Sequence, residues 1–260
     1  MLHAKNIHKA FGGVKALQGV TLTIQPKCIT ALIGPNGAGK TTLFDIINGL
    51  IAPDTGELFL EKENMTRLPS HIRAQRGISR TWQAVRLFKH LTMFDHLRMA
   101  ENNEDTNILK NIFLFSKKQT HTCHPEVRGN AQHCRASKDH YELVLQKFGI
   151  DRSPQTLVSH LSYGQRKLLQ LAMVSLQPHK ILLLDEPVAG VNQVVQAHIE
   201  NVLLKLKDEG ETICIIEHDM EFVQKIADHT IVMDAGRVLM EGSPREVLKD
   251  KMVLEAYLGE

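Results

Sequence analysis

A glycine-rich octapeptide constrains this chain more than any other feature of its sequence. It is Gly34-Pro-Asn-Gly-Ala-Gly-Lys-Thr41, which fits the pattern G-x4-G-K-[ST] at every fixed position. The apolar run Ile29–Ile33 precedes it and has the composition of a fully buried strand. A stretch with helix-compatible apolar spacing, Thr41–Leu50, follows it. The order strand, glycine loop, helix is the context in which such a loop binds phosphate.

Each part of the octapeptide has a physical role in binding a nucleoside triphosphate. Glycines let the backbone adopt positive φ, so that successive N–H groups point at phosphate oxygens. The helix that begins near Lys40 adds the positive end of its dipole. We expect Lys40 to reach the β- and γ-phosphates and the Thr41 hydroxyl to ligate Mg²⁺, which makes ATP and Mg²⁺ the predicted cofactors. The predicted nucleotide contacts in this loop are Gly34, Pro35, Asn36, Gly37, Ala38, Gly39, Lys40, Thr41 and Thr42.

A second apolar run, Ile181–Leu184, ends in the adjacent acids Asp185 and Glu186. Desolvating a carboxylate is costly, and a nearby cation such as the Mg²⁺ of a bound nucleotide offsets that cost. Neighbouring residues at a strand end point to opposite faces. Asp185 is therefore predicted to face the metal, and Glu186 to face the attacking water as general base. The alternative is that both are solvated loop acids.

Composition limits the possible partners. The 260 residues include 31 Lys and Arg against 29 Asp and Glu, a formal net charge of +2, which argues against a nucleic-acid partner. No run approaches the ~18 apolar residues of a membrane helix. The first eight residues lack the apolar region of a signal peptide, and the four cysteines have no disulfide or CxxC spacing. We expect a folded protein in a reducing cytoplasm.

Apolar patterning predicts an α/β core that is interrupted by helices. Between about 86 and 148 helical spacing occurs twice, and the intervening residues 116–137 have little periodicity, which predicts a long loop. The α/β pattern returns after Leu161 with a helix that Ser162 caps. Strands are predicted at Val20–Gln25, Ile29–Ile33, Glu57–Glu61, Ile181–Leu184, Thr212–Glu217, Thr230–Asp234 and Gly236–Glu241, and helices at Thr41–Leu50, Tyr141–Phe148, Ser162–Leu176 and Val194–Lys207, before a C-terminal helix.

Further motifs, in order along the chain, resemble those of the nucleotide-binding subunits of ABC (ATP-binding cassette) transporters. Leu161-Ser-Tyr-Gly-Gln165 resembles the signature LSGGQ, and Gln83 in Arg80-Thr-Trp-Gln83 resembles the Q-loop. His218 follows a predicted strand where this family has its switch histidine, and Phe11 stands where an aromatic side chain stacks on adenine. The resemblance covers essentially the whole chain. It implies a P-loop NTPase of the ABC type, with a mixed β-sheet core, an N-terminal antiparallel β subdomain and an inserted α-helical subdomain.

The resemblance also implies one domain over residues 1–260, with the core and β subdomain in 1–85 and 161–260 and the helical subdomain in 86–160. It implies that two cassettes, identical or sister subunits, complete each ATP site. Ser162, Gly164 and Gln165 of one chain would contact the nucleotide on the phosphate loop of the other. His218 would contact the γ-phosphate and the general base, and Gln83 would contact Mg²⁺ and the attacking water. Taken alone, Ser162 is a common helix cap, His218 is one of 14 histidines, and Gln83 is a surface amide.

Three positions depart from the family pattern. Tyr163 replaces the first signature glycine, a change that is tolerable if the side chain points outward. Asn192 stands where many relatives have aspartate, and Phe11 replaces the commoner tyrosine. None of the three removes a predicted catalytic or phosphate-binding residue, so we expect both sites of a homodimer to hydrolyse ATP.

Four segments resemble cassettes of branched-chain or hydrophobic amino-acid importers: Gly77-Ile-Ser-Arg-Thr-Trp-Gln83, Arg86-Leu-Phe88, Ala189-Gly-Val-Asn192 and Ala256-Tyr-Leu-Gly-Glu260. Cassettes for urea uptake and lipopolysaccharide export share much of this pattern. The implied partners are integral membrane permease subunits and, indirectly, a periplasmic binding protein, and the implied location is peripheral, at the cytoplasmic face of the inner membrane. A soluble ABC ATPase outside transport and a small-molecule kinase with the same loop are the other hypotheses.

Two clusters each keep two interpretations. Leu87, Phe88, Leu91 and Phe94 form either a groove for a coupling helix of the membrane subunit or part of the core of the helical lobe. The Cys/His-rich segment 121–140 forms either a metal site or a variable loop, and it contains His121, Cys123, His124, His133, Cys134 and His140.

Overall fold

A computed structural model of the chain describes residues 1–81, 85–101 and 130–258, with the backbone alone for 130–138 and 258. The described chain forms two compact units. The first comprises Met1–Ala84 with Pro178–Glu260, and the second comprises Val85–Gln177. None of the helices in these described ranges is long and apolar enough to cross a bilayer.

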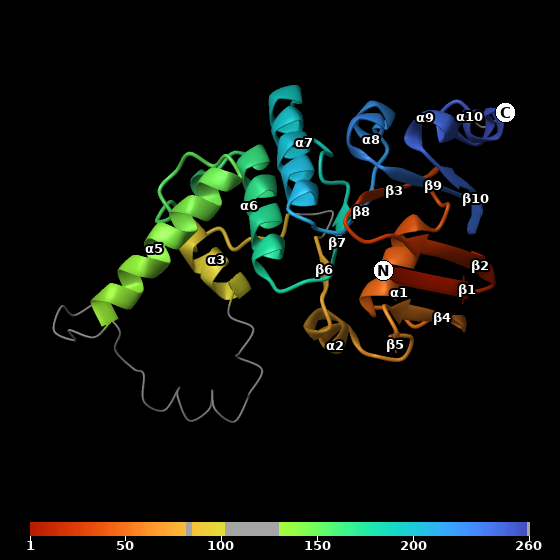
Figure 1. Cartoon of the computed structure of the whole chain (residues 1–260), viewed down its shortest axis with the longest axis horizontal. Coiled ribbons are helices and arrows are strands. Elements are labelled where there is room, and N and C mark those ends of the chain that lie inside the picture. The colour runs from red at the N-terminus through yellow and green to blue at the C-terminus, as the bar shows by residue number, and fades with distance from the viewer. Residues whose placement is uncertain (82–84, 102–129, 259–260) are drawn as a thin grey trace. The chain divides into compact units, whose positions relative to one another are not determined.

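The first unit is built on a six-stranded sheet with the strand order β10-β9-β3-β8-β7-β6 (Figure 1). Its three central strands are β3 (Ile29–Ile33), β8 (Ile213–Ile216) and β7 (Ile181–Asp185), which run parallel and are buried along their whole length. Continuous apolar runs are typical of parallel strands that are covered on both faces. The sheet is completed by the parallel strands β6 (Ile78–Arg80) and β9 (His229–Asp234) and by the antiparallel edge strand β10 (Arg237–Gly242).

This topology places three chemically active segments at one edge of the sheet. The glycine loop follows β3, Asp185 ends β7, and the segment Glu217–His218 follows β8. Because parallel strands share the edge at which they end, these segments lie close together although they are far apart in the sequence.

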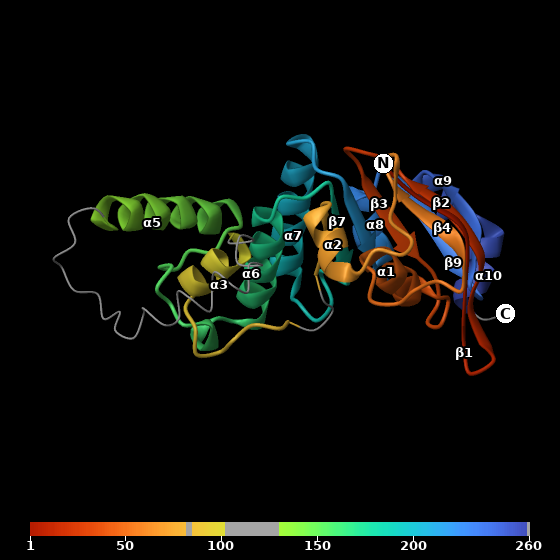
Figure 2. The ribbon, with the colours of Figure 1, turned by 90° about the horizontal axis from the view of Figure 1, so that it is seen from below.

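A second, antiparallel sheet completes the first unit, with the order β2-β1-β4-β5. Its strands are β1 (Leu2–Phe11), β2 (Val14–Ile24), β4 (Thr55–Leu60) and β5 (Glu63–Asn64), and Figures 1 and 2 show β1, β2 and β4 side by side. Apolar residues of this sheet form one buried cluster with residues of the six-stranded sheet and with α1 (Lys40–Asn48). That cluster fixes the helix behind the glycine loop.

The remaining helices of the first unit are α2 (Ser70–Gln75), α7 (Gln193–Asp208), α8 (Met220–Ile226), α9 (Pro244–Val247) and α10 (Lys251–Leu258). Arg73 on α2 is almost completely buried and donates hydrogen bonds to the carbonyls of Ile46 and Ile47. These carbonyls lie in the last turn of α1, beyond the reach of N–H groups within the helix, and the Ile46 carbonyl also accepts the N–H of the cap residue Gly49 at 3.1 Å. Arg73 therefore satisfies the carboxyl end of the helix whose other end faces the glycine loop.

The second unit is helical. It contains α3 (Met93–Glu101), α5 (Asn130–Lys147) and α6 (Tyr163–Leu176), and α3 and α5 both pack against α6. This packing explains why the unit extends to Gln177, whereas the resemblance implied that the helical segment ends at 160.

Two local expectations for this region were wrong. Residues 130–137 belong to α5 and not to a loop, because Ala, Gln and Arg favour a helix even without an apolar stripe. The first stretch of helical spacing, which begins near residue 86, is helical only from Met93 onward, and residues 87–91 are not in a helix. Thr92 and Asp95 exchange hydrogen bonds in the manner of a capping box, so α3 begins only at Met93. Most other predicted elements are present, with ends that differ by a few residues.

Candidate active site

The glycine loop has a backbone that only glycine accommodates at two positions. Gly34 has φ of +147°, and a Cβ there would lie 2.0 Å from the carbonyl oxygen of Met233. Gly39 has φ of +97°, and its Cβ would lie 2.5 Å from the carbonyl oxygen of Ala16. Gly39 also precedes α1, so no side chain caps the amino end of that helix. The first N–H groups of α1 and its dipole are therefore available to an anion.

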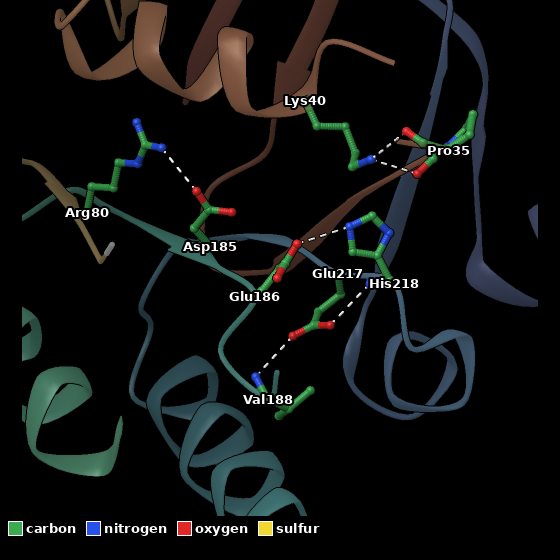
Figure 3. A network of polar contacts seen from close by, with 9 residues as sticks. Pro35, Lys40, Arg80, Asp185, Glu186, Val188, Glu217 and His218 are labelled. Carbon is green, nitrogen blue, oxygen red and sulfur yellow. Dashed lines mark hydrogen bonds and ion pairs between the residues drawn. The ribbon is translucent and has the colours of Figure 1, made fainter. Parts of the chain in front are cut away.

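Lys40, at the end of the glycine loop, is buried. Its Nζ donates hydrogen bonds to the carbonyl oxygens of Gly34 at 2.6 Å and of Pro35 at 2.9 Å. Figure 3 shows the Lys40 side chain pointing toward Pro35. Burial lowers the pKa of Lys40, while the carboxylates of Glu186 and Asp185 oppose that shift. Within the described part of the chain, this ammonium group donates its hydrogen bonds to neutral carbonyls, which it can exchange for the oxygens of an anion.

A cavity of about 290 Å³ lies in front of the loop, close to the lower end of the range for small-molecule sites. Four segments that are distant in the sequence form its wall: one residue of β2, the glycine loop with the start of α1, the residue after β7, and the end of β8 with the residue beyond Glu217. The lining residues are Ala16, Asn36, Gly37, Ala38, Gly39, Lys40, Thr41, Thr42, Glu186, Ile216 and His218.

Glu186 and His218 face each other in this cavity. The Glu186 Oε1 and the His218 Nε2 are 3.1 Å apart (Figure 3). Glu186 has φ of +47°, in the left-handed region, and its N–H donates to the carbonyl of Ile216 at 3.0 Å. A left-handed conformation costs a non-glycine residue about 1–3 kcal/mol and is concentrated at functional sites. Asp185 and Glu186 were predicted to point to opposite faces of an extended strand. The chain instead turns sharply at Glu186, and the Glu186 carboxylate lies beside His218.

Asp185 is paired with a residue whose role the sequence did not indicate. Its Oδ2 lies 3.1 Å from Nη2 of Arg80, while Nη1 of the same guanidinium lies 2.5 Å from Oδ1 of Asp45 on α1. The N–H of Asp185 also donates to the hydroxyl of Thr81 at 3.1 Å. Burial raises the pKa of Asp185, and Arg80 opposes the shift. Arg80 lies on β6, a three-residue strand that the sequence pattern did not predict. Its ion pair with Asp185 therefore becomes visible only in the structure.

The oxygen donors near the loop suit a hard cation. The Thr41 hydroxyl lies on the first turn of α1, and the Asp185 carboxylate ends β7; hydroxyl and carboxylate oxygens are typical ligands of Mg²⁺. The third predicted ligand, Gln83, lies outside the described residues. So do His121, Cys123 and His124 of the Cys/His-rich segment.

The signature segment lies in the second unit, where it begins α6. The Ser162 hydroxyl accepts the N–H of Gln165 (3.2 Å), and the Gln165 side-chain oxygen accepts the N–H of Ser162 (3.0 Å), which forms a capping box. A capping serine keeps its own hydroxyl proton for another acceptor. The Tyr163 side chain is 41% exposed, as a substituent at that position requires, and Gly164 is buried.

Two further predicted positions occupy exposed sites. Phe11 ends β1 and is 46% exposed, with Lys9 Nζ 5.4 Å from the centroid of its ring. An exposed aromatic ring is available for stacking. Asn192 caps α7 by accepting the N–H of Val195 at 3.0 Å.

The site combines a glycine loop, which lies between a buried parallel strand and an uncapped helix, with an acid at the end of a nearby strand. This combination defines the class of P-loop nucleoside triphosphatases. Residues 17–189 match the family model described as ABC transporter. The chain therefore belongs to the ABC transporter family, and it is an ATP-binding cassette and transport ATPase of that family. The predicted family and fold are confirmed.

Individual relatives match over their full length. The high-affinity branched-chain amino acid transport ATP-binding protein BraF of Pseudomonas aeruginosa is 35% identical over 264 residues, covering 100% of this chain and 98% of BraF. The lipopolysaccharide export system ATP-binding protein LptB of Haemophilus influenzae is 30% identical over 260 residues, with coverage of 100% and 98%. A crystal structure of the ADP conformation of an ATP-binding cassette of an ABC transporter has a TM-score of 0.82 and 31% identity, with coverage of 100% and 99%.

Proposed function

We propose that this chain powers the uptake of branched-chain or other hydrophobic amino acids across the inner membrane by hydrolysing ATP. Full-length similarity to BraF supports the class of transported substrate. The chain would bind peripherally to integral permease subunits at the cytoplasmic face, with a periplasmic binding protein as an indirect partner. The observation that carries the hydrolytic role is the contact of 3.1 Å between Glu186 and His218 beside the glycine loop.

Binding of ATP follows from groups on the first unit. The N–H groups at the start of α1 and the Lys40 ammonium would hold the phosphates, and the exposed ring of Phe11 would stack on adenine. Thr41 and Asp185, together with Gln83, would hold Mg²⁺, which when bound neutralises phosphate charge. On ATP binding, Lys40 would exchange its hydrogen bonds to loop carbonyls for bonds to phosphate oxygens. The new bonds are stronger because both partners are charged, which offsets the free energy lost with the carbonyl contacts.

Hydrolysis requires a water to attack the γ-phosphorus. Glu186 would accept a proton from that water as the bond from water oxygen to phosphorus forms. The bond from the γ-phosphorus to the oxygen bridging it to the β-phosphate breaks, and ADP and phosphate leave. His218 would hold the Glu186 carboxylate in place through their contact and donate a hydrogen bond to a γ-phosphate oxygen.

A second cassette, either another copy or a sister subunit, would complete the site. Its Ser162, Gly164 and Gln165 lie at the amino end of a 14-residue helix, whose N–H groups and dipole favour an anion. The hydroxyl proton of Ser162 is the group that the capping box leaves for a γ-phosphate oxygen.

The test replaces Glu186 by glutamine, which keeps its size and removes the base. We expect Glu186→Gln to bind ATP, to form an ATP-dependent dimer in size-exclusion chromatography, and to hydrolyse ATP about 10²–10⁴-fold more slowly than the parent. Glu63→Gln, at an exposed surface ion pair, is the matched control and should keep the parental rate. Parental hydrolysis by Glu186→Gln would refute the assignment of the base.

Lipopolysaccharide export is the second candidate, because LptB also matches over its full length. Affinity purification of the chain from detergent-solubilised native membranes separates the two candidates through the permeases that accompany it. Stimulation of ATP hydrolysis in the purified complex by leucine with a periplasmic binding protein supports import. Stimulation by lipopolysaccharide supports export.

A further inference from the structure

Glu217 is a buried acid that the mechanism above does not use. It follows the last residue of β8, directly before His218, and is only 3% exposed. A carboxylate in such a place requires hydrogen-bond donors, because an uncompensated buried charge is strongly destabilising.

The donors come from two separate loops. Oε1 of Glu217 accepts the N–H of Val188 at 3.1 Å, and Oε2 accepts the N–H of His218 at 3.1 Å (Figure 3). Val188 belongs to the loop that carries Glu186 and leads to Asn192, and His218 belongs to the loop after β8. One carboxylate therefore joins the segment of the general base to the segment of the switch histidine.

A second contact ties the loop after β8 to α7, the helix that follows the Glu186 loop. The Gln196 side chain on α7 donates to Oδ2 of Asp219 at 2.7 Å, and Oδ1 of Asp219 accepts the N–H of Phe222 to cap α8. The residue after the switch histidine is thus tied to the helix that Asn192 caps. Glu217 thus ties the segment 217–219 to the loop 186–192, and Gln196 ties the same segment to α7, the helix that directly follows that loop.

We propose that Glu217 is a positioning residue that fixes these two loops against each other, so that His218 meets Glu186 in the geometry that hydrolysis requires. The proposal rests on the function proposed above. It requires a carboxylate specifically, since both oxygens accept N–H groups. A glutamine of the same size offers one acceptor, and its NH₂ group would face one of the two N–H donors.

The test is Glu217→Gln in the full chain. We expect kcat for ATP hydrolysis to fall about tenfold or more, the effect of losing one hydrogen bond to a buried charged acceptor, while KM for ATP changes less than about threefold. The matched control is Glu211→Gln, which replaces an acid whose Oε2 lies 2.6 Å from Nε2 of His179, and it should leave kcat unchanged.

A double-mutant cycle separates positioning from a general loss of structure. In a His218→Ala background, Glu217→Gln should reduce kcat by less than about twofold, because the residue it positions is already absent. Additive losses would overturn the proposal. Circular dichroism checks that each variant folds. If Glu217→Gln does not fold, Glu217→Asp replaces it in the cycle, with the same expected coupling to His218→Ala. Aspartate keeps two acceptor oxygens but has a shorter side chain.

Dimer formation gives a readout that does not depend on hydrolysis. In a Glu186→Gln background, Glu217→Gln should raise the ATP concentration needed for dimerisation at least about threefold, because the loop that ends at Asn192 loses its anchor. Parental kcat in Glu217→Gln, together with an inactive Glu186→Gln, would refute the positioning role alone. Parental kcat in Glu186→Gln would refute the proposed function itself.

Discussion

The contact of Arg80 with Asp45 and Asp185 predicts a large and specific loss of stability on removal of the guanidinium. In Arg80→Met the side chain keeps much of its volume, and its packing on Phe44 is replaced by a thioether–ring contact. The two carboxylates lose the cation between them. Asp185 then remains as a buried acid, because its side chain is only 5% exposed.

The magnitude follows from burial. Removing one partner of a buried ion pair typically costs about 3–5 kcal/mol. Asp45 lies at the outer side of the group with 23% of its side chain exposed, so water can partly solvate it, and we expect about 3 kcal/mol. With a urea dependence of about 3 kcal/mol per M for a chain of this size, the midpoint should fall by about 1 M.

The assay is urea unfolding without nucleotide or Mg²⁺, followed by circular dichroism. Arg76→Met is the control, since Arg76 forms an ion pair with Glu63 in which both side chains are about half exposed; the loss should stay below about 1 kcal/mol. The double variant Arg80→Met with Asp185→Asn removes the stranded charge and should regain at least about 1 kcal/mol. If it unfolds at the same urea concentration as Arg80→Met, the buried carboxylate is not the source of the loss.

Three further predictions concern the loop, the signature and the antiparallel sheet. Gly34→Ala would place a Cβ 2.0 Å from the Met233 carbonyl oxygen, so ATP binding should be lost in calorimetry; parental affinity would contradict the steric argument. Ser162→Asp keeps a helix cap but repels phosphate, so the melting temperature should be retained while the ATP-dependent dimer is lost, and a stable dimer would leave Ser162 a cap only. The hydrogen bond from Lys9 lowers the pKa of Asp54. The ionised Asp54 therefore stabilises the fold fully at pH values above the ordinary pKa of aspartate, near 4, and this stabilisation is lost as the pH falls through the lowered pKa. Urea unfolding between pH 5 and pH 3 should accordingly show a steeper loss in the parent than in Asp54→Asn, and equal slopes would contradict this linkage.

The core of the fold and the phosphate loop could be predicted because their signals are local. Ile29–Ile33 is apolar at every position, and the following octapeptide contains glycine where the backbone adopts positive φ. The helix after Ser162 was predictable for the same reason, since a cap and apolar spacing lie within one segment. Such features depend on residues that are neighbours in the chain.

The remaining features depend on residues that are distant in the chain. The contact between Arg80 and Asp185 spans 105 positions, and no local pattern marks Arg80 as the partner of an acid. Glu217 gave no signal because its donors are backbone N–H groups, which every residue except proline carries. The start of α5 at Asn130 was missed for a different reason: its first residues are polar, and helix propensity without an apolar stripe is a weak signal.

The left-handed backbone at Glu186 has a consequence for how this protein would change under selection. Glycine and asparagine tolerate that conformation better than glutamate does, so either substitution should relieve local strain. Neither residue can act as a base. A laboratory population selected only for abundance or heat resistance should therefore accumulate glycine or asparagine at position 186, whereas one whose growth depends on the proposed ATP hydrolysis should retain the strained glutamate.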